Sequence, residues 1–277
     1  MSYQDLAYAM QPMPCRVIDA HTHIGPYYLS GWQQKRDKTD LDSLMQLMAQ
    51  LGVDAIVTAP HPLVQGHMEL ANRMAAEAAE NYPGRIYGYI SIVPPCGEQA
   101  VRQALREYGE NKNFVGLKLL CGGYHGQLLQ KEYEYALDFA DEMRCPVLMH
   151  IWENNPPQTQ IRDVLQRHHD LHLIVAHQGG GSAKQTDGLV PIMQEFENVS
   201  MELCGSLFNT YAVEDLARLV GAQRLIFGTD SINLDMRYDF GKVAFSPMPD
   251  ADKEAIFAEN FLRLTERSAM GKLYFPG

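Results

Sequence analysis

Two histidines separated by one residue, His21 and His23 in the segment DAHTH, are the first candidates for chemistry in this 277-residue chain. In a β-strand, side chains two residues apart point to the same face, so both imidazoles can reach one point. Imidazole is a frequent ligand of zinc, iron and manganese, and the pattern indicates a metal site. The alternative is a pair of core histidines bonded to backbone carbonyls.

Three further polar residues end other apolar segments of the chain. His150 closes PVLMH, His177 closes LIVAH and Asp230 closes LIFGTD. In a barrel of parallel strands these carboxyl ends meet at one mouth, where barrel enzymes build their active sites. Convergence of all five groups favours a metal-centred site over five separate core positions. Three or four such ligands leave a place for a water molecule, whose pKa the metal lowers.

The segments that must position these residues alternate between short apolar runs and helical stretches. The eight predicted strands span residues 16–24, 53–59, 85–93, 114–120, 145–151, 171–177, 199–204 and 224–230. Apolar residues at helical spacing fill the gaps, for example in 41–51, 132–143 and 159–170. Eight strand–helix units without a long Gly/Ser linker predict an α/β protein with a single-domain (β/α)8 TIM-type barrel.

This barrel is predicted to occupy residues 1–277 as one domain. Residues 1–14 are expected to form an N-terminal extension, and residues 250–267 a closing helix. The long stretch 25–40 after the first strand carries Tyr27, Tyr28 and Trp32, and we expect a loop over the mouth.

Composition excludes several classes of function. The formal net charge of -11 opposes binding to the phosphate backbone of nucleic acids. No apolar run approaches the roughly 20 residues that span a bilayer, and the N-terminus lacks the charged start of a signal peptide. We therefore expect a cytoplasmic protein without a membrane partner. Its five cysteines are odd in number and lack CxxC spacing, which predicts buried free thiols.

The motifs IDAHTHIG, GLKLL, PVLMH, IVAHQGGG, IFGTDS and IFAENFLRL together resemble the amidohydrolase superfamily. The similarity is greatest to amidohydrolase family 2, which includes hydrolases, lactonases and non-oxidative decarboxylases. It covers nearly the whole chain, and Asn260 takes its usual place in the last motif. The resemblance implies a homodimer that acts on a small molecule.

The resemblance also implies roles for the strand-end residues. His21, His23, His150 and Asp230 would bind one divalent ion, zinc in the first place, with manganese and iron as alternatives. Asp230 would also carry a proton. His177 matches a histidine that orients or activates water beside the ion in single-metal members.

Lys118 lies in the fourth predicted strand, where some superfamily members carry a carboxylated lysine that bridges two metals. With His177 as a further ligand, a binuclear site is therefore the alternative to a single ion. We prefer one ion, with Lys118 as a substrate or polar-network residue. A lysine whose ammonium reaches solvent is the remaining possibility.

Other residues near the predicted mouth are weaker candidates. Glu202 and Cys204, in the seventh predicted strand, are expected to line or support the site. The predicted substrate-lining residues are Trp32, His61, His125, Trp152, Glu153 and Arg237.

Three functions fit this site. The main prediction is hydrolysis of an amide, ester or lactone by metal-activated water, with Asp230 or His177 transferring the proton. The alternative is decarboxylation of an aromatic or unsaturated acid, and the third is an inactive barrel that serves as a binding protein. Decarboxylases of this branch tend to be longer, so the compact chain favours hydrolysis. A cationic side chain that clamps the carboxylate of the substrate would favour decarboxylation, and only Lys118 and Arg237 qualify for this role.

Overall fold

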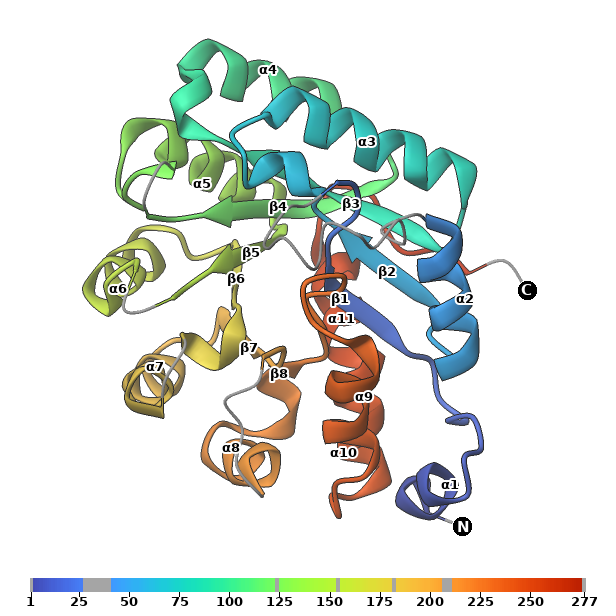
Figure 1. The fold of residues 1–277 in the computed structure, drawn as a ribbon. Helices are drawn as coiled ribbons and strands as arrows, with labels where there is room; N and C mark the ends of the chain where they lie inside the picture. The colour runs from blue at the N-terminus through green and yellow to red at the C-terminus, as the bar shows by residue number, and fades with distance from the viewer. Residues whose placement is uncertain are drawn as a thin grey trace, which may run out of the picture.

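The computed structural model describes residues 2–26, 41–122, 125–152, 155–180, 183–205 and 211–275. Eight parallel strands follow one another around a single α/β domain in chain order (Figure 1). They are β1 (Ile18–Thr22), β2 (Ala55–Thr58), β3 (Ile86–Ile92), β4 (Phe114–Leu120), β5 (Pro146–His150), β6 (His172–Val175), β7 (Val199–Glu202) and β8 (Leu225–Ile226).

The sheet closes on itself through bonds between β1 and the segment that follows β8. The Ala20 N–H donates to the Phe227 carbonyl at 3.1 Å, and the Asp230 N–H donates to the His21 carbonyl at 2.7 Å. Thr22 and Ser231 form a parallel bridge. This closure confirms the predicted TIM-type barrel, and it places Asp230 beside the strand that carries both histidines of the HxH motif.

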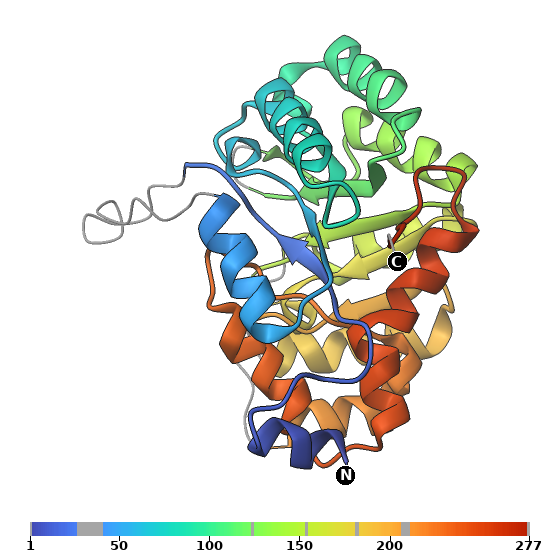
Figure 2. The ribbon, with the colours of Figure 1, turned by 90° about the vertical axis from the view of Figure 1, so that its right-hand side faces the viewer.

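Helices surround the strands (Figures 1 and 2). They are α1 (Tyr3–Tyr8), α2 (Leu41–Leu51), α3 (Met68–Asn81), α4 (Glu98–Gly109), α5 (Lys131–Met143), α6 (Gln158–Arg167), α7 (Ala183–Glu195), α8 (Ala212–Val220), α9 (Met236–Ala244), α10 (Asp250–Glu254) and α11 (Asn260–Arg267). Short 3-10 turns lie at His61–Leu63, Pro94–Cys96, His177–Gly179 and Ala222–Arg224. A π-helical segment, Ala255–Glu259, joins α10 to α11, so residues 250–267 form an irregular helix.

The strands are apolar because both of their faces are covered. Every residue of β3 and β4 is buried. Close strand packing explains Gly116 in β4, since a Cβ atom there would lie 2.3 Å from the Pro146 carbonyl oxygen.

The N-terminal residues pack against the far end of the chain. The Tyr3 N–H donates to Asp250 at 2.9 Å, and the ring of Tyr8 lies 5.2 Å from that of Phe245. All five cysteines are free, but Cys96 is exposed and Cys15 is only half-buried, so the expectation of burial was wrong at these two. Cys96 is the last residue of the turn Pro94–Cys96 that follows β3, and it lies at the surface. No helix within the described ranges is long and apolar enough to cross a membrane.

Candidate metal centre

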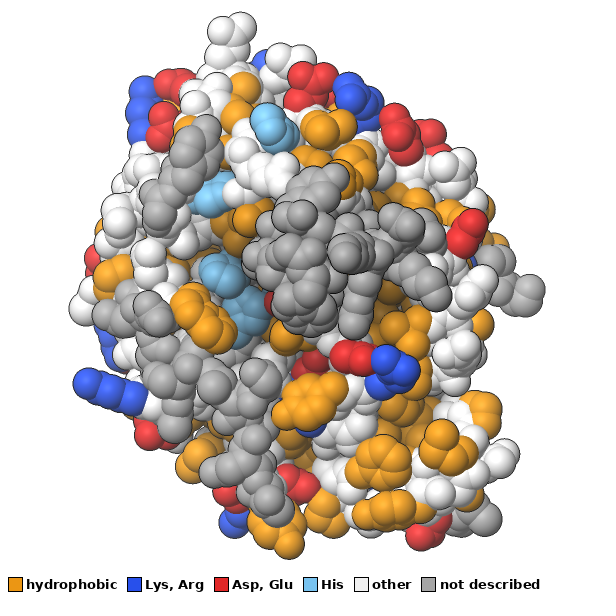
Figure 3. Space-filling model, viewed as in Figure 1, with side chains coloured by type: hydrophobic (Ala, Val, Ile, Leu, Met, Phe, Trp, Pro, Cys, Tyr) orange, Lys and Arg blue, Asp and Glu red, His pale blue; other side chains and the backbone are white. Residues whose placement is uncertain are grey.

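Histidine side chains gather on the face of the molecule that Figure 1 views (Figure 3). Each of the strand-end residues expected from the sequence lies at or just beyond the carboxyl end of its strand. His21 lies in β1 and His150 ends β5, while His177 and Asp230 follow β6 and β8. The barrel therefore brings the predicted groups to one mouth.

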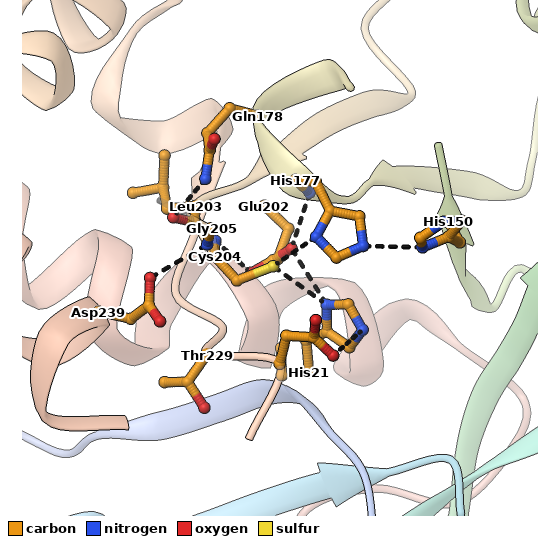
Figure 4. Close-up of polar contacts among 12 residues, drawn as sticks. His21, His150, His177, Gln178, Glu202, Leu203, Cys204, Gly205, Thr229 and Asp239 are labelled. Carbon is orange, nitrogen blue, oxygen red and sulfur yellow. Dashed lines mark hydrogen bonds and ion pairs between the residues drawn. The ribbon is translucent and has the colours of Figure 1, made fainter. Parts of the chain in front are cut away.

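The ring of His21 is held by Glu202 of β7. Its Nδ1 lies 3.1 Å from Glu202 Oε2, and both side chains are fully buried (Figure 4). A carboxylate oxygen can only accept, so Nδ1 carries the proton, and the lone pair of a neutral His21 is on Nε2. Gly228 makes room for this carboxylate, because a Cβ atom at that position would lie 2.4 Å from Glu202 Oε1.

The ring of His23 is fixed in the same way by the main chain of the neighbouring strand. Its Nδ1 donates to the carbonyl of Ala59, which directly follows β2. Its Nε2 then points at Asp230, with 3.1 Å between Nε2 and Oδ1. Both histidines of the HxH motif thus turn their Nε2 atoms toward one carboxylate.

Asp230 lies beyond β8 in a left-handed backbone conformation, with φ of 53°. Such a conformation is uncommon for a residue other than glycine and is maintained by its surroundings. Here the Asp230 N–H bonds to the His21 carbonyl, and the Asn233 amide donates to Asp230 Oδ1 at 2.9 Å. Burial alone would raise the pKa of Asp230, but the hydrogen bond with His23 holds the pKa well below its usual value.

His177 and His150 form a second pair beside the first. His177 Nε2 lies 2.8 Å from His150 Nδ1, and the rings meet edge to face (Figure 4). Burial lowers the pKa of His177 to about 4 and that of His150 well below its usual value, with His177 adding to the second shift. Both imidazoles are therefore neutral at physiological pH, which is the form that binds metals.

Cys204 completes this side of the mouth. Its Sγ lies 3.0 Å from His177 Nδ1 and 3.6 Å from His21 Nδ1. Glu202 accepts from the main-chain N–H groups of both Cys204, at 2.6 Å, and His177, at 3.2 Å. The sequence placed Glu202 and Cys204 near the mouth, and the structure shows that this one carboxylate organises three segments.

Lys118 projects from β4 into the same cluster. Its Nζ lies 2.7 Å from His21 Nε2, and the side chain is fully buried. Burial lowers the pKa of Lys118 to about 8, although the negative charge of Asp230 works against that shift. The possibility of a lysine that reaches solvent was therefore wrong, because every residue of β4 is buried and the Lys118 ammonium lies inside the barrel.

Two supporting groups lacked a role in the sequence analysis. The Asp19 carboxylate accepts from the N–H groups of His21, at 3.1 Å, and Thr229, at 3.0 Å, and so ties β1 to the segment after β8. Asn233 links His61 to Asp230, since its Oδ1 lies 2.8 Å from His61 Nε2. In the sequence, the only indication of this contact is that Asn233 lies three residues after Asp230.

The weaker candidates for lining the substrate site lie in different positions relative to the mouth. Trp152 is 44% exposed and its ring lies 6.0 Å from that of His177, so it borders the mouth. His61 is completely buried, stacks on His23 and supports the cluster rather than lining a cavity. The His125 ring binds the Val64 carbonyl at 3.3 Å. Trp32 and Glu153, with Tyr27 and Tyr28, lie outside the described residues.

Arg237 does not enter the cluster. Its guanidinium is 69% exposed and forms two bonds with Asp235, at 2.9 and 2.6 Å. Asp235 caps α9 and lies two residues before Arg237 in the chain, so this ion pair is local. The expectation that Arg237 lines the substrate site stays a prediction.

The donor atoms at the mouth suit a divalent ion. His21, His23 and Asp230 offer atoms within 4.8 Å of one another. In the tautomer that carries its proton on Nδ1 in both rings, which is the form that a bound cation requires, the Nε2 lone pairs and the Asp230 oxygen face each other as three acceptors. A cation between them would satisfy all three, and imidazole with carboxylate suits zinc, manganese or iron. We call these three residues the primary cluster.

Comparison with known proteins agrees with this geometry. Residues 18–264 match the amidohydrolase family Amidohydro_2. A search of curated proteins gave no match. Among solved structures, a dihydroxybenzoic acid decarboxylase from a Polaromonas species, with bound manganese and 2-nitroresorcinol, superposes with a TM-score of 0.70 at 16% identity, over 91% of this chain and 97% of that one.

Two further similar structures are a decarboxylase and a proposed hydrolase. A 5-carboxyvanillate decarboxylase from Novosphingobium aromaticivorans, complexed with manganese and 4-hydroxy-3-methoxy-5-nitrobenzoic acid, has a TM-score of 0.70 at 14% identity, over 91% and 96% of the two chains. A proposed 2-pyrone-4,6-dicarboxylic acid hydrolase from Pseudomonas putida has a TM-score of 0.66 at 17% identity, over 92% and 99%. The fold and the family match together show that this chain is a TIM-barrel member of the amidohydrolase family 2 of metal-dependent hydrolases and decarboxylases.

Proposed function

We propose that this protein is a metal-dependent, non-oxidative decarboxylase of a small aromatic or unsaturated carboxylic acid. The observation that carries the proposal is the position of Lys118, whose ammonium is buried 2.7 Å from His21 Nε2. A cationic side chain beside the metal ligands, placed to clamp the carboxylate of the substrate, is the feature expected to distinguish decarboxylation from hydrolysis. Arg237, the other candidate cation, pairs with Asp235 instead.

The charge of Lys118 suits an anionic substrate. A carboxylate that enters a buried site loses its hydration, and a cation with N–H donors offsets that cost. A neutral lactone, ester or amide has no comparable need for a buried ammonium. We infer that Lys118 binds the carboxylate of the substrate beside the imidazoles and the Asp230 carboxylate of the cluster.

The earlier preference for hydrolysis rested on the compactness of the chain, and that argument does not hold. The superposition with the Polaromonas decarboxylase covers 97% of that protein, so nearly all of a decarboxylase barrel has its equivalent here. Several of the similar solved structures are aromatic acid decarboxylases. This supports the lyase alternative, although identities of 17% or less carry only the fold.

In this proposal His21, His23, His150 and Asp230 hold one divalent ion, manganese or zinc. The ion supplies a positive charge that binds substrate oxygens and withdraws electrons from the carbon that bears the carboxyl group. Glu202 and the Ala59 carbonyl orient the two rings of the HxH motif, and Lys118 pairs with the carboxylate. A site with two ions and a carboxylated Lys118 is the alternative.

The reaction requires one proton. As the bond between the carbon and the carboxyl group breaks, its electron pair stays on the carbon, and CO2 leaves. A proton must then reach that carbon from a group at the mouth. Asp230 and His177 are proposed to pass this proton from solvent to the carbon, because ligand atoms of both lie together at the mouth.

The test is a panel of hydroxybenzoic acids and lactones offered to protein loaded with manganese or zinc, with CO2 and hydrolysis products measured separately. We expect CO2 from an aromatic acid, and a chelator should abolish it. Hydrolysis of a lactone without CO2 release would support the main alternative. Failure to turn over any substrate with a full complement of metal would favour a binding protein.

Lys118→Met, with Arg237→Met as the control, tests the proposed clamp. A charge-assisted hydrogen bond contributes about 1.5–3 kcal/mol, so KM for the acid should rise roughly 10- to 150-fold in the Lys118 variant only. An unchanged KM would contradict the clamp. Loss of a bound ion from Lys118→Met would instead show that the lysine is a bridging ligand, and elemental analysis detects that loss.

A further inference from the structure

Cys204 is a buried thiol among metal-binding groups that the proposed reaction does not use. Its side chain is completely buried, and Sγ lies 3.0 Å from His177 Nδ1. Cys145 is equally buried, but it precedes β5 and therefore lies at the opposite end of the barrel. Burial alone does not explain why a thiol stands at the mouth.

Asp230 provides a third donor to this group. Ligand atoms of His177, Cys204 and Asp230 lie within 4.8 Å of one another. The three residues come from the ends of β6, β7 and β8, and each is at least nine-tenths buried. We call them the thiol cluster. Asp230 also belongs to the primary cluster, and its two carboxylate oxygens allow it to serve both.

The thiol cluster is held in place by its neighbours. Glu202 accepts from the main-chain N–H of both His177 and Cys204, which sets the distance between the two segments. His150 engages Nε2 of His177, so Nδ1 faces Cys204 (Figure 4). Such outer hydrogen bonds orient the ligands of metal sites. The arrangement is therefore that of a supported donor set.

The distances suit a tetrahedral ion with little movement. Zinc binds sulfur at about 2.3 Å and imidazole nitrogen at about 2.0–2.1 Å, so two such ligands of one ion stand about 3.6 Å apart. The Sγ–Nδ1 distance of 3.0 Å would have to widen by roughly half an ångström. A rotation of either side chain is enough for this change.

We propose that the thiol cluster is a second metal site, selective for a thiophilic divalent ion such as zinc and distinct from the primary cluster. On binding, Cys204 loses its thiol proton to solvent and the thiolate takes the ion, together with His177 Nδ1 and an Asp230 oxygen. Manganese prefers oxygen and nitrogen ligands, so it would fill the primary cluster and leave the thiol cluster to zinc. His177 is then a ligand, and Asp230 alone remains to carry the proton of the proposed reaction.

Cobalt(II) reports directly on a thiolate ligand, because sulfur-to-cobalt charge transfer gives a near-ultraviolet band that nitrogen and oxygen ligands do not give. Cobalt added to chelator-treated full-length protein should produce this band. Cys204→Ser should lose the band together with one equivalent of bound cobalt per chain. The matched control Cys145→Ser, which changes an equally buried thiol, should keep both.

X-ray absorption of the unmodified, zinc-loaded protein gives a second measurement that needs no variant to fold. We expect a zinc–sulfur distance of about 2.3 Å. Cobalt binding without the charge-transfer band, together with a zinc shell of nitrogen and oxygen alone, would overturn the proposal. Neither measurement involves turnover, so failure of the proposed decarboxylase activity would leave this result unaffected.

Discussion

The role of each histidine at the mouth depends on what its second ring nitrogen contacts. Nδ1 of His21 binds Glu202, whereas Nδ1 of His23 binds the Ala59 carbonyl. In both rings this leaves Nε2 to face Asp230. His177 is the reverse case, since its Nε2 is engaged by His150 and its Nδ1 faces Cys204.

Glu202→Gln tests the importance of this orientation at the residue scale. The amide keeps the size of the carboxylate but loses the negative charge that fixes and polarises the His21 ring. Loss of an outer-shell partner typically weakens metal binding about 10- to 100-fold, and we expect a change of that size in titrations with manganese or zinc.

The control for Glu202→Gln is Asp239→Asn. Asp239 is also a buried carboxylate near this end of the barrel, but it binds Lys242 and the Gly205 N–H. This variant should retain wild-type metal affinity. Equal affinities in the wild type and Glu202→Gln would show that the Glu202 contact does not support a metal ligand.

At the scale of elements, the sequence predicted all eight strands because buried parallel strands are nearly continuous in apolar residues. The last predicted strand, 224–230, was too long, since β8 ends at Ile226. Its later residues bond to β1 without a regular ladder, and Asp230 turns into the left-handed region. Those features follow from closure of the barrel, which a local pattern does not contain.

The contacts within the site were likewise only partly predictable from local sequence patterns. Strand-end positions were predictable because the carboxyl ends of parallel strands meet at one mouth. The pairing of Glu202 with His21 joins β7 to β1 across the barrel, and the contact of Lys118 with His21 joins β4 to β1. These contacts depend on register and side-chain direction. Sequence spacing also gave no warning that Arg237 would pair with Asp235.

His172, at the start of β6, gives a prediction about the stability of the barrel wall. Burial, with added repulsion from Arg224 and neighbouring arginines, lowers the pKa of His172 from 6.5 to about 3. The unfolded chain therefore binds the proton more readily between these values. Stability is fully present above pH 6.5 and is lost as the pH falls toward 3, by about 1.4 kcal/mol per pH unit.

Urea unfolding at a series of pH values measures this loss. His172→Gln can keep the contact with Ser200 Oγ, which lies 2.8 Å from His172 Nε2, and it should flatten the decline below pH 6.5. Replacing the exposed His169 with glutamine should leave the decline unchanged. Parallel declines in the wild type and His172→Gln would contradict the assignment of acid sensitivity to this residue.

At the scale of the whole molecule, the protein carries a net charge of -11, yet the mouth of the barrel contains a buried lysine, Lys118. Substrate attraction therefore depends on local charge at the site rather than on the overall balance. The large exposed apolar side chains include Met10, Tyr8 and Leu219. Single exposed apolar side chains of this kind are common on protein surfaces.

The predicted homodimer can be tested by light scattering at micromolar concentration. We expect twice the mass of one chain, with the same result in the presence and absence of a chelator, because the ligands of the primary cluster all come from one barrel. The mass of a single chain under these conditions would show that the barrel acts alone.

The most direct measurement of the central claim is mass spectrometry of the product formed in D2O by metal-loaded protein from the most reactive aromatic acid. Decarboxylation replaces the carboxyl group with a solvent-derived proton, so the account predicts release of CO2 and one non-exchangeable deuterium on the carbon that carried it. An aromatic acid that keeps its carboxyl group and releases no CO2, while the same metal-loaded protein hydrolyses a lactone, would contradict the account.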